Sequence, residues 1–209
     1  MVTPLTLLHT SDVHVAVFDA LRDRNHPGAA LRHLVVPELL ARARAEGPEA
    51  VAPALRELLR GSGGPVLVTC STIGGTAESL APALGLPVLR VDRPMAAAAV
   101  AAGPRIAVLA TVESTLLPTC ELLAEEAGER PVSITPHLVA GAWERFEAGD
   151  GAGCRDLVAT AADAVTEADV ILLAQVSMAG AAELTASGIP VLSSPARGLA
   201  AGLRLHSEG

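Results

Sequence analysis

The sequence predicts an α/β fold with two pseudo-symmetric lobes, each a mostly parallel sheet flanked by helices. Short β-rich runs alternate with longer helical stretches, which is typical of parallel α/β sheets. The order of these elements repeats after roughly 100 residues. Ala, Leu and Val supply most of the 50% hydrophobic residues, and aromatic residues make up only 1%. Small aliphatic side chains suit helices that pack closely over a parallel sheet.

Runs of Val, Leu and Ile mark the expected strands, in chain order, at residues 5–9, 66–69, 88–91, 106–110, 132–135, 170–173 and 191–193. Helices are expected between them, at residues 14–22, 37–45, 50–60, 76–83, 94–102, 114–127, 140–147, 155–166, 178–187 and 195–203. Proline lies at or near the start of several of these helices, where its missing N–H is tolerated. The chain therefore alternates between the two element types along its length.

An internal repeat defines the two lobes. The segments beginning at Gly64 and at Ala168 share the order strand, polar turn, helix, glycine and proline-led strand, and LTLLHTS near the start resembles RIAVLATVES from Arg105. We expect a first lobe at residues 1–103 and a second at 104–209, with crossings back between lobes allowed near 92–103 and 195–209. Ligands of such sheets bind outside the carboxyl ends of the strands, so we expect the active site in the cleft between the lobes.

Composition excludes several classes of function. The net charge of −8 argues against a nucleic-acid partner. All fifteen basic residues are Arg, so no lysine can form a Schiff base with pyridoxal phosphate or serve a phosphate-binding loop, and Tyr is absent. Cys70, Cys120 and Cys154 have no spacing typical of disulfides or zinc sites. We expect no cofactor and no metal, with proton chemistry left to Cys, His, Asp, Glu or water.

The N-terminal segment lacks the basic region and cleavage signal of a secretory peptide, and no apolar run reaches the roughly 18 residues of a membrane span. We therefore expect a cytoplasmic protein without a membrane partner. A homodimer or higher homo-oligomer is the default assembly for such a fold.

The turn that begins at Thr69 carries the strongest chemical signal. Cys70 follows an apolar strand and precedes a helix, whose free N–H groups stabilise a thiolate there. The same N–H groups, with the hydroxyls of Ser71 and Thr72, could hold a carboxylate or an enolate. Alternatively, Cys70 is a small buried residue at a strand end. Cys120 and Cys154 lie in the middle of expected helices, which indicates structural roles.

These features resemble the aspartate/glutamate/hydantoin racemase superfamily over essentially the whole chain. The resemblance rests on the turn VLVTCSTIGG, the early strand ending in His9-Thr10-Ser11, the strand ending in Ala110-Thr111, and the approximate duplication. Members of that family lack cofactors and use thiols between their lobes to move a proton at the carbon α to a carboxylate. The resemblance thus implies a small carboxylate as substrate.

The resemblance also implies roles for individual residues. Cys70 matches the catalytic cysteine of the first lobe, and Ser71 and Thr72 match the adjoining substrate-binding residues. Ser11 matches an early hydroxyl that contacts the substrate. Thr111, with Ser114 and Thr115 close by, matches the hydroxyl cluster that grips the substrate carboxylate.

One position departs from the family pattern. The second lobe carries Ala174-Gln175-Val176-Ser177 where racemases of the family usually have Gly-Cys-Thr. Glutamine is neither an acid nor a base at neutral pH, so a symmetric two-thiol racemisation lacks its second thiol. Decarboxylases of the superfamily need only one cysteine, although theirs lies in the second lobe. In the maleate isomerase branch the first thiol acts as a nucleophile.

The sequence thus predicts a cofactor-independent isomerase or racemase that uses Cys70 on a small acid. Its substrate-binding residues would be Thr10, Ser11, Ser71, Thr72, Thr111, Gln175 and Ser177. His9 and His14 flank the early turn and are candidates for a second acid or base, because histidine titrates near neutral pH. The alternatives are a decarboxylase of malonate-type acids on the same scaffold and a non-catalytic protein that binds a small acid.

Overall fold

The computed structural model describes residues 3–205 and divides the chain into two compact units. The first unit contains the chain up to Val91 together with the segment from Pro195 onward, and the second is Asp92–Ser194. Each unit holds one four-stranded sheet in which every strand pair is parallel. The predicted fold class of two similar α/β lobes is therefore confirmed.

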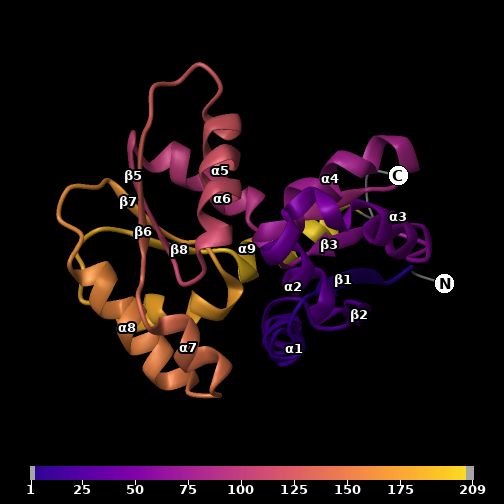
Figure 1. Ribbon diagram of the computed structural model, residues 1–209, viewed down its shortest axis with the longest axis horizontal. Helices are drawn as coiled ribbons and strands as arrows, with labels where there is room; N and C mark the ends of the chain where they lie inside the picture. Colours follow the sequence, from indigo (N-terminus) through magenta and orange to yellow (C-terminus); the bar gives the residue numbers. More distant parts are fainter. Residues whose placement is uncertain (1–2, 206–209) are drawn as a thin grey trace. The chain divides into compact units, whose positions relative to one another are not determined.

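The first unit has the strand order β2-β1-β3-β4, of which Figure 1 labels β2, β1 and β3. Its strands are β1 (Leu5–His9), β2 (Leu31–Val35), β3 (Val66–Val68) and β4 (Val88–Arg90). Its helices are α1 (Val13–Asn25), α2 (Pro37–Glu46), α3 (Ala52–Arg60), α4 (Ser71–Leu84) and α9 (Pro195–Arg204), with the short 3-10 helix η1 (Pro48–Val51).

The alternation of side chains along its strands builds the layers of the first unit. Leu8, Val66 and Val68 point to one face of the sheet, into a core shared with α2, α3 and α4. Gly202 of α9 lies against Leu5 and Leu67 on the opposite face, where α1 also packs on α9. The sheet is therefore buried on both faces, as expected for parallel strands.

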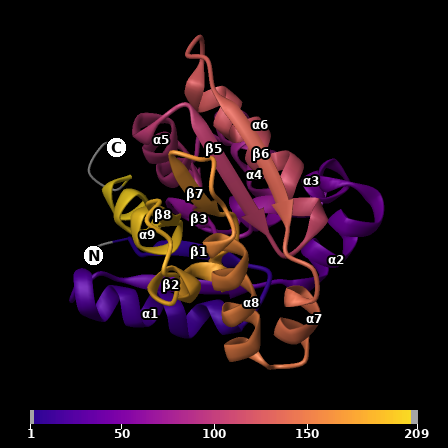
Figure 2. The same ribbon diagram turned by 90° about the vertical axis from the view of Figure 1, so that its left-hand side faces the viewer.

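The second unit repeats this architecture, with the strand order β6-β5-β7-β8 (Figure 2). Its strands are β5 (Arg105–Ala110), β6 (Ser133–Leu138), β7 (Val170–Leu173) and β8 (Val191–Ser193). Its helices are α5 (Arg93–Ala102), α6 (Glu113–Ala127), α7 (Ala142–Glu147), α8 (Gly151–Asp163) and the 3-10 helix η2 (Val176–Glu183).

Strand β5 shows how the second unit forms three layers. Ile106, Val108 and Ala110 face the core of α5 and α6, whereas Ala107 and Leu109 face the core of α7, α8 and η2. Almost all of these core residues are Ala, Val, Leu or Ile, as the composition predicts. The equal strand orders of the two sheets match the repeat found in the sequence.

The main differences from the sequence-based expectations concern three elements. Strand β2 was not predicted, because arginine and histidine interrupt its short apolar run. It lies at the sheet edge, where its residues are half-buried or exposed. Helix α4 begins at Ser71 rather than at residue 76, so it starts immediately after Cys70. The helix expected at 178–187 is a 3-10 helix, η2, at Val176–Glu183.

Packing of two helices sets the boundaries of the units. The sequence places the join near Gly103–Pro104 and allows crossings near 92–103 and 195–209. In the structure, α5 buries Met95 and Val100 in the core of the second unit. Helix α9 returns to the first unit, where Gly198 approaches Val91 so closely that a Cβ atom would lie 2.5 Å from its carbonyl oxygen. The chain therefore crosses between the units after Val91 and after Ser194.

We expect Gly198→Ala to destabilise the first unit by about 2–3 kcal/mol, because the added methyl group meets backbone atoms that cannot move aside. Gly188→Ala is the matched control, since nothing lies within 4 Å of its Cβ position. Urea unfolding of both variants measures the difference. Equal stabilities for the two variants would contradict the close packing of α9 on Val91.

Among residues 3–205, no helix is long and apolar enough to cross a membrane.

Candidate functional site

Each sheet has one point where the chain leaves neighbouring strands in opposite directions. In the first unit this point lies between β1 and β3, and in the second it lies between β5 and β7. Loops diverge at such switch points and leave room for a ligand beyond the carboxyl ends of the strands. The turns that follow these four strands are therefore the candidate sites.

The strand registers bring the predicted residues together in matching pairs. Leu8 pairs with Val68 in the first unit, and two residues further along each segment the same register leads to Thr10 and Cys70. Leu109 pairs with Leu173 in the second unit, and the same step of two residues leads to Thr111 and Gln175. Gln175 thus occupies in its unit the position that Cys70 occupies in the first.

Cys70 is the N-cap residue of α4, with extended backbone angles of φ −110° and ψ 114°. Its side chain is buried, and burial raises the pKa of the thiol. The hydroxyl of Thr10 and the N–H groups of Ile73 and Thr72 face the sulfur and act in the opposite direction. Because burial dominates, the thiol is protonated at neutral pH and is suited to donating a proton.

The hydroxyl side chains around Cys70 belong to the same turns. Thr10, Ser71 and Thr72 are buried, and Ser11 is half-buried. Ser71 and Thr72 form the first turn of α4, where the helix N-terminus favours negative charge. The first unit therefore combines one thiol with hydroxyl and N–H donors at a single strand edge.

Arg90 strengthens this donor set and was not predicted from the sequence. Its guanidinium Nη2 donates to the carbonyl oxygen of Ser71 at 3.4 Å, and its backbone N–H donates to Glu78 Oε1 at 2.9 Å. A Cβ atom on Gly74 would lie 2.8 Å from Arg90 Cβ, so only glycine fits beneath this side chain. The buried arginine places a positive charge beside the first turn of α4.

The two predicted histidines are both buried in the first unit. His9 uses both ring nitrogens, since Nδ1 bonds to Thr69 Oγ1 at 2.8 Å and Nε2 bonds to His33 Nδ1 at 2.8 Å. Desolvation, followed by the neighbouring His14 and His33, lowers the pKa of His9 to about 3. Within the described residues, neither buried ring nitrogen of His14 has a hydrogen-bond partner, and burial lowers the pKa of His14 to about 4. Both rings are therefore neutral near pH 7.

Gln175 closes the equivalent turn of the second unit. Its Oε1 accepts three hydrogen bonds, from Thr111 N at 2.6 Å, Thr111 Oγ1 at 3.0 Å and Val112 N at 3.2 Å. These N–H groups lie at the start of α6. An amide oxygen therefore occupies the donors that could otherwise bind one oxygen of a carboxylate.

Two serines complete the second turn. Ser177 is half-buried in the first turn of η2, after the N-cap residue Gln175. The Oγ atom of Ser114 is buried without a hydrogen-bond partner in the described structure. Ser114 lies in the first turn of α6, three residues after Thr111, so its hydroxyl is a further potential donor near that turn.

We expect Gln175→Leu to lower the free energy of unfolding by about 1–3 kcal/mol, because it leaves the donors of Thr111 and Val112 without their acceptor. Gln175→Glu keeps an acceptor oxygen and should retain most of that stability. Chemical denaturation of the two variants measures the effect. If leucine and glutamate were tolerated equally, the hydrogen bonds of Gln175 would not stabilise this turn.

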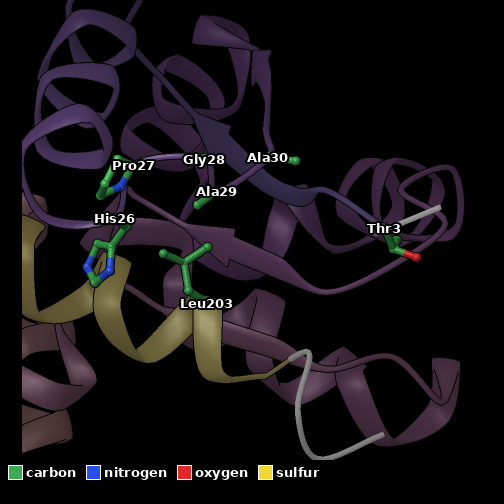
Figure 3. Close-up of a pocket in the computed structure, with 7 residues that line it drawn as sticks. All are labelled: Thr3, His26, Pro27, Gly28, Ala29, Ala30 and Leu203. Carbon is green, nitrogen blue, oxygen red and sulfur yellow. The ribbon is translucent and has the colours of Figure 1, made fainter.

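A separate pocket of about 380 Å³ lies at the other end of the first sheet (Figure 3). Thr3 and Ala30 line it, directly before β1 and β2, together with Leu203 of α9 and His26. It is therefore at the amino ends of the strands, away from Cys70. Among residues 3–205, no group of three or more His, Cys, Asp or Glu side chains is arranged to hold a metal ion.

Comparison with solved structures shows which proteins share this fold. A glutamate racemase isoform from Bacillus anthracis matches with a TM-score of 0.76 at 17% identity, over 99% of this chain and 83% of that one. Picrophilus torridus aspartate racemase gives 0.73 at 15% identity, over 98% and 94%. A variant of arylmalonate decarboxylase in a sulfate-associated form gives 0.61 at 21% identity, over 99% and 94%.

No protein-family model matches the chain, and no curated protein matches it significantly in sequence. The structural matches nevertheless confirm, at the level of the fold, the resemblance to the aspartate/glutamate racemases. Fold alone does not determine a reaction, so the chemistry must be argued from the strand-end turns.

Proposed function

We propose that this chain is a cofactor-independent isomerase or racemase that moves a proton at the carbon α to the carboxylate of a small acid. The observation that carries the proposal is the position of Cys70, a thiol at the switch point of a parallel sheet and at the N-terminus of α4. The racemases that share the fold support the same class of reaction.

The surroundings of Cys70 suit this chemistry. If the thiolate form of Cys70 takes the proton next to the carboxylate, it becomes a thiol and the substrate becomes an enolate, whose negative charge needs hydrogen-bond donors. The helix N-terminus, the hydroxyl of Thr10 and the nearby guanidinium of Arg90 provide positive potential in the first unit. In the second unit, the turns at Thr111, Gln175 and Ser177 carry polar groups of the same kind at the equivalent strand edge.

A decarboxylase of malonate-type acids is the second candidate, and two observations favour it. Loss of carbon dioxide itself produces the enolate, so the enzyme needs one proton donor and no base. Cys70 is held in the protonated form by burial, and the equivalent position in the second unit is Gln175, which cannot exchange protons. One protonated thiol is sufficient for this reaction.

Proton NMR in D₂O tests both candidates in one experiment. The purified chain is incubated with amino acids, hydantoins, maleate and substituted malonates, one at a time. Deuterium incorporation or change of configuration at the α carbon would support the isomerase, and release of carbon dioxide with one-face deuteration would support the decarboxylase. If no compound reacted but several raised the melting temperature, the chain would be an acid-binding protein and the proposed function would be wrong.

A further inference from the structure

A continuous chain of hydrogen bonds runs through the first unit, from the turn of Cys70 to the protein surface. Thr69 precedes Cys70, and its Oγ1 bonds to His9 Nδ1 at 2.8 Å. His9 Nε2 bonds to His33 Nδ1 at 2.8 Å, and His33 Nε2 faces Asp19 Oδ1 at 3.4 Å. The members come from β1, β2, α1 and the end of β3, so the chain links four separate segments.

The order of exposure along this chain is graded. Thr69 and His9 are fully buried, with 2% and 0% of their surface exposed. The side chain of His33 is 16% exposed and that of Asp19 is 37% exposed. The inner end of the chain is therefore dry, and its outer end reaches solvent.

When the rings of His9 and His33 are both neutral, their hydrogen-bond partners determine which ring nitrogens carry protons. The carboxylate of Asp19 can only accept, so His33 carries its proton on Nε2 and accepts on Nδ1. His9 must then donate from Nε2, and its Nδ1 accepts from the hydroxyl of Thr69. All donors in this state point outward, from Thr69 toward Asp19.

One added proton reverses part of the chain. A doubly protonated His33 donates from both nitrogens, so His9 Nε2 becomes an acceptor and the single proton of His9 moves to Nδ1. His9 then donates to Thr69, whose hydroxyl turns to the carbonyl oxygen of Leu8 at 3.1 Å. The structure provides an acceptor for Thr69 in each state, so neither state leaves a buried group unpaired.

We propose that Thr69, His9, His33 and Asp19 form a proton relay in which protonation of His33 switches the tautomer of His9 and the direction of the Thr69 hydroxyl beside Cys70. A proton that reaches Thr69 is passed on as follows: Thr69 gives its own proton to His9 Nδ1, and His9 gives its Nε2 proton to His33 Nδ1. The number of protons is conserved, and the cation ends next to Asp19. The role of the relay in controlling the turn of Cys70 rests on the proposed function. The tautomer switch of His9 does not depend on it.

The surroundings of the relay agree with a switch in which only His33 changes charge. Burial, and then the His14 and His33 rings, lower the pKa of His9 to about 3, so His9 stays neutral and changes only its tautomer. The His14 ring lies 6.1 Å from that of His9 and is neutral near pH 7. On α1, Arg22 bonds to Asp19 at 2.7 Å. Hydrogen bonds within such a network polarise one another, so a charge at His33 and Asp19 affects the hydrogen bond between His9 and Thr69.

Nitrogen-15 NMR of the full chain, labelled in histidine, reads the tautomer of each ring between pH 8.5 and 5.5. We expect His9 to carry its proton on Nε2 at high pH and on Nδ1 at low pH, in step with double protonation of His33. A His9 tautomer that stays constant while His33 titrates would overturn the proposal. His33→Phe keeps a ring but removes both nitrogens, and in it the tautomer of His9 should no longer depend on pH.

Asp19→Asn tests the outer end without disturbing the core, because Asp19 is half-exposed. Loss of its negative charge removes the carboxylate that faces His33 Nε2 and should move the switch of His9 to lower pH. Asp23→Asn is the matched control, since Asp23 also bonds to Arg22, at 2.9 Å, but is more exposed and lies one helical turn further on. Equal shifts in the two variants would refute the specific role of Asp19.

The tautomer experiment and the activity experiment fail independently. If no acid reacts in D₂O, the proposed function is wrong, yet the switch of His9 is still measurable. If the chain is active, Asp19→Asn should move the pH profile of its rate by the same amount as the tautomer, whereas Asp23→Asn should not. A rate profile that did not move with the tautomer would separate the relay from Cys70 and overturn its role there.

Discussion

Replacement of Cys70 by alanine is expected to lower the rate of proton transfer to the α carbon by about 10²–10⁴-fold, the usual contribution of a general acid or base. The thiol is the acid–base group at the switch point of the first sheet, and the equivalent Gln175 cannot replace it. The fold should be retained, because alanine keeps the Cβ atom of Cys70 and adds no atom that could clash, although loss of the buried sulfur costs some stability. Deuterium incorporation into the best substrate of the panel measures the rate.

Cys120→Ala is the control for this prediction, since Cys120 is a free, half-buried thiol within α6 and outside the strand-end turns. Its activity should remain within about twofold of the wild type, as for a residue without a role in transition-state binding. A Cys70→Ala variant with full activity would exclude every mechanism proposed above. Equal loss of activity in both variants would indicate damage to folding rather than to chemistry.

The positions of the central strands could be predicted because their physical signals are strong and local. Runs such as Leu5–His9 and Val170–Leu173 are apolar throughout, as strands buried on both faces must be. The same runs fixed the locations of Thr10, Cys70, Thr111 and Gln175, because a residue just after a buried strand lies at the sheet edge. The pairing of these four residues then follows from register.

What the sequence did not reveal depends on contacts between distant segments. The edge strand Leu31–Val35 has no continuous apolar run, so it was not predicted as a strand. The hydrogen bond from its residue His33 to His9 therefore could not be foreseen. Arg90 ends a short strand and shows its role only when Gly74 of α4 lies beneath it. Even for Gln175, the sequence indicated that a thiol is missing, but it did not reveal the three hydrogen bonds that the amide oxygen accepts.

Stability should fall steeply as the solution is acidified, because two buried histidines must be protonated on unfolding. The pKa values of His9 and His14 are lowered to about 3 and about 4, against 6.5 in the unfolded chain. The unfolded state therefore binds more protons below pH 6.5, and stability present above that pH is lost as the pH falls. Between pH 7.5 and 5 each ring should cost about 2 kcal/mol, or about 4 kcal/mol together.

Urea unfolding at pH 7.5, 6 and 5, at constant ionic strength, measures this loss. His14→Leu should remove about half of the pH dependence. It should leave the stability at pH 7.5 nearly unchanged, because neither ring nitrogen of His14 has a hydrogen-bond partner among residues 3–205 that could be lost. His137→Gln is the control, because His137 is exposed and its replacement leaves both buried rings in place. If His14→Leu retained that dependence too, burial of His14 would not contribute to acid sensitivity, and the neutral His9–His14 pair would have to be reconsidered.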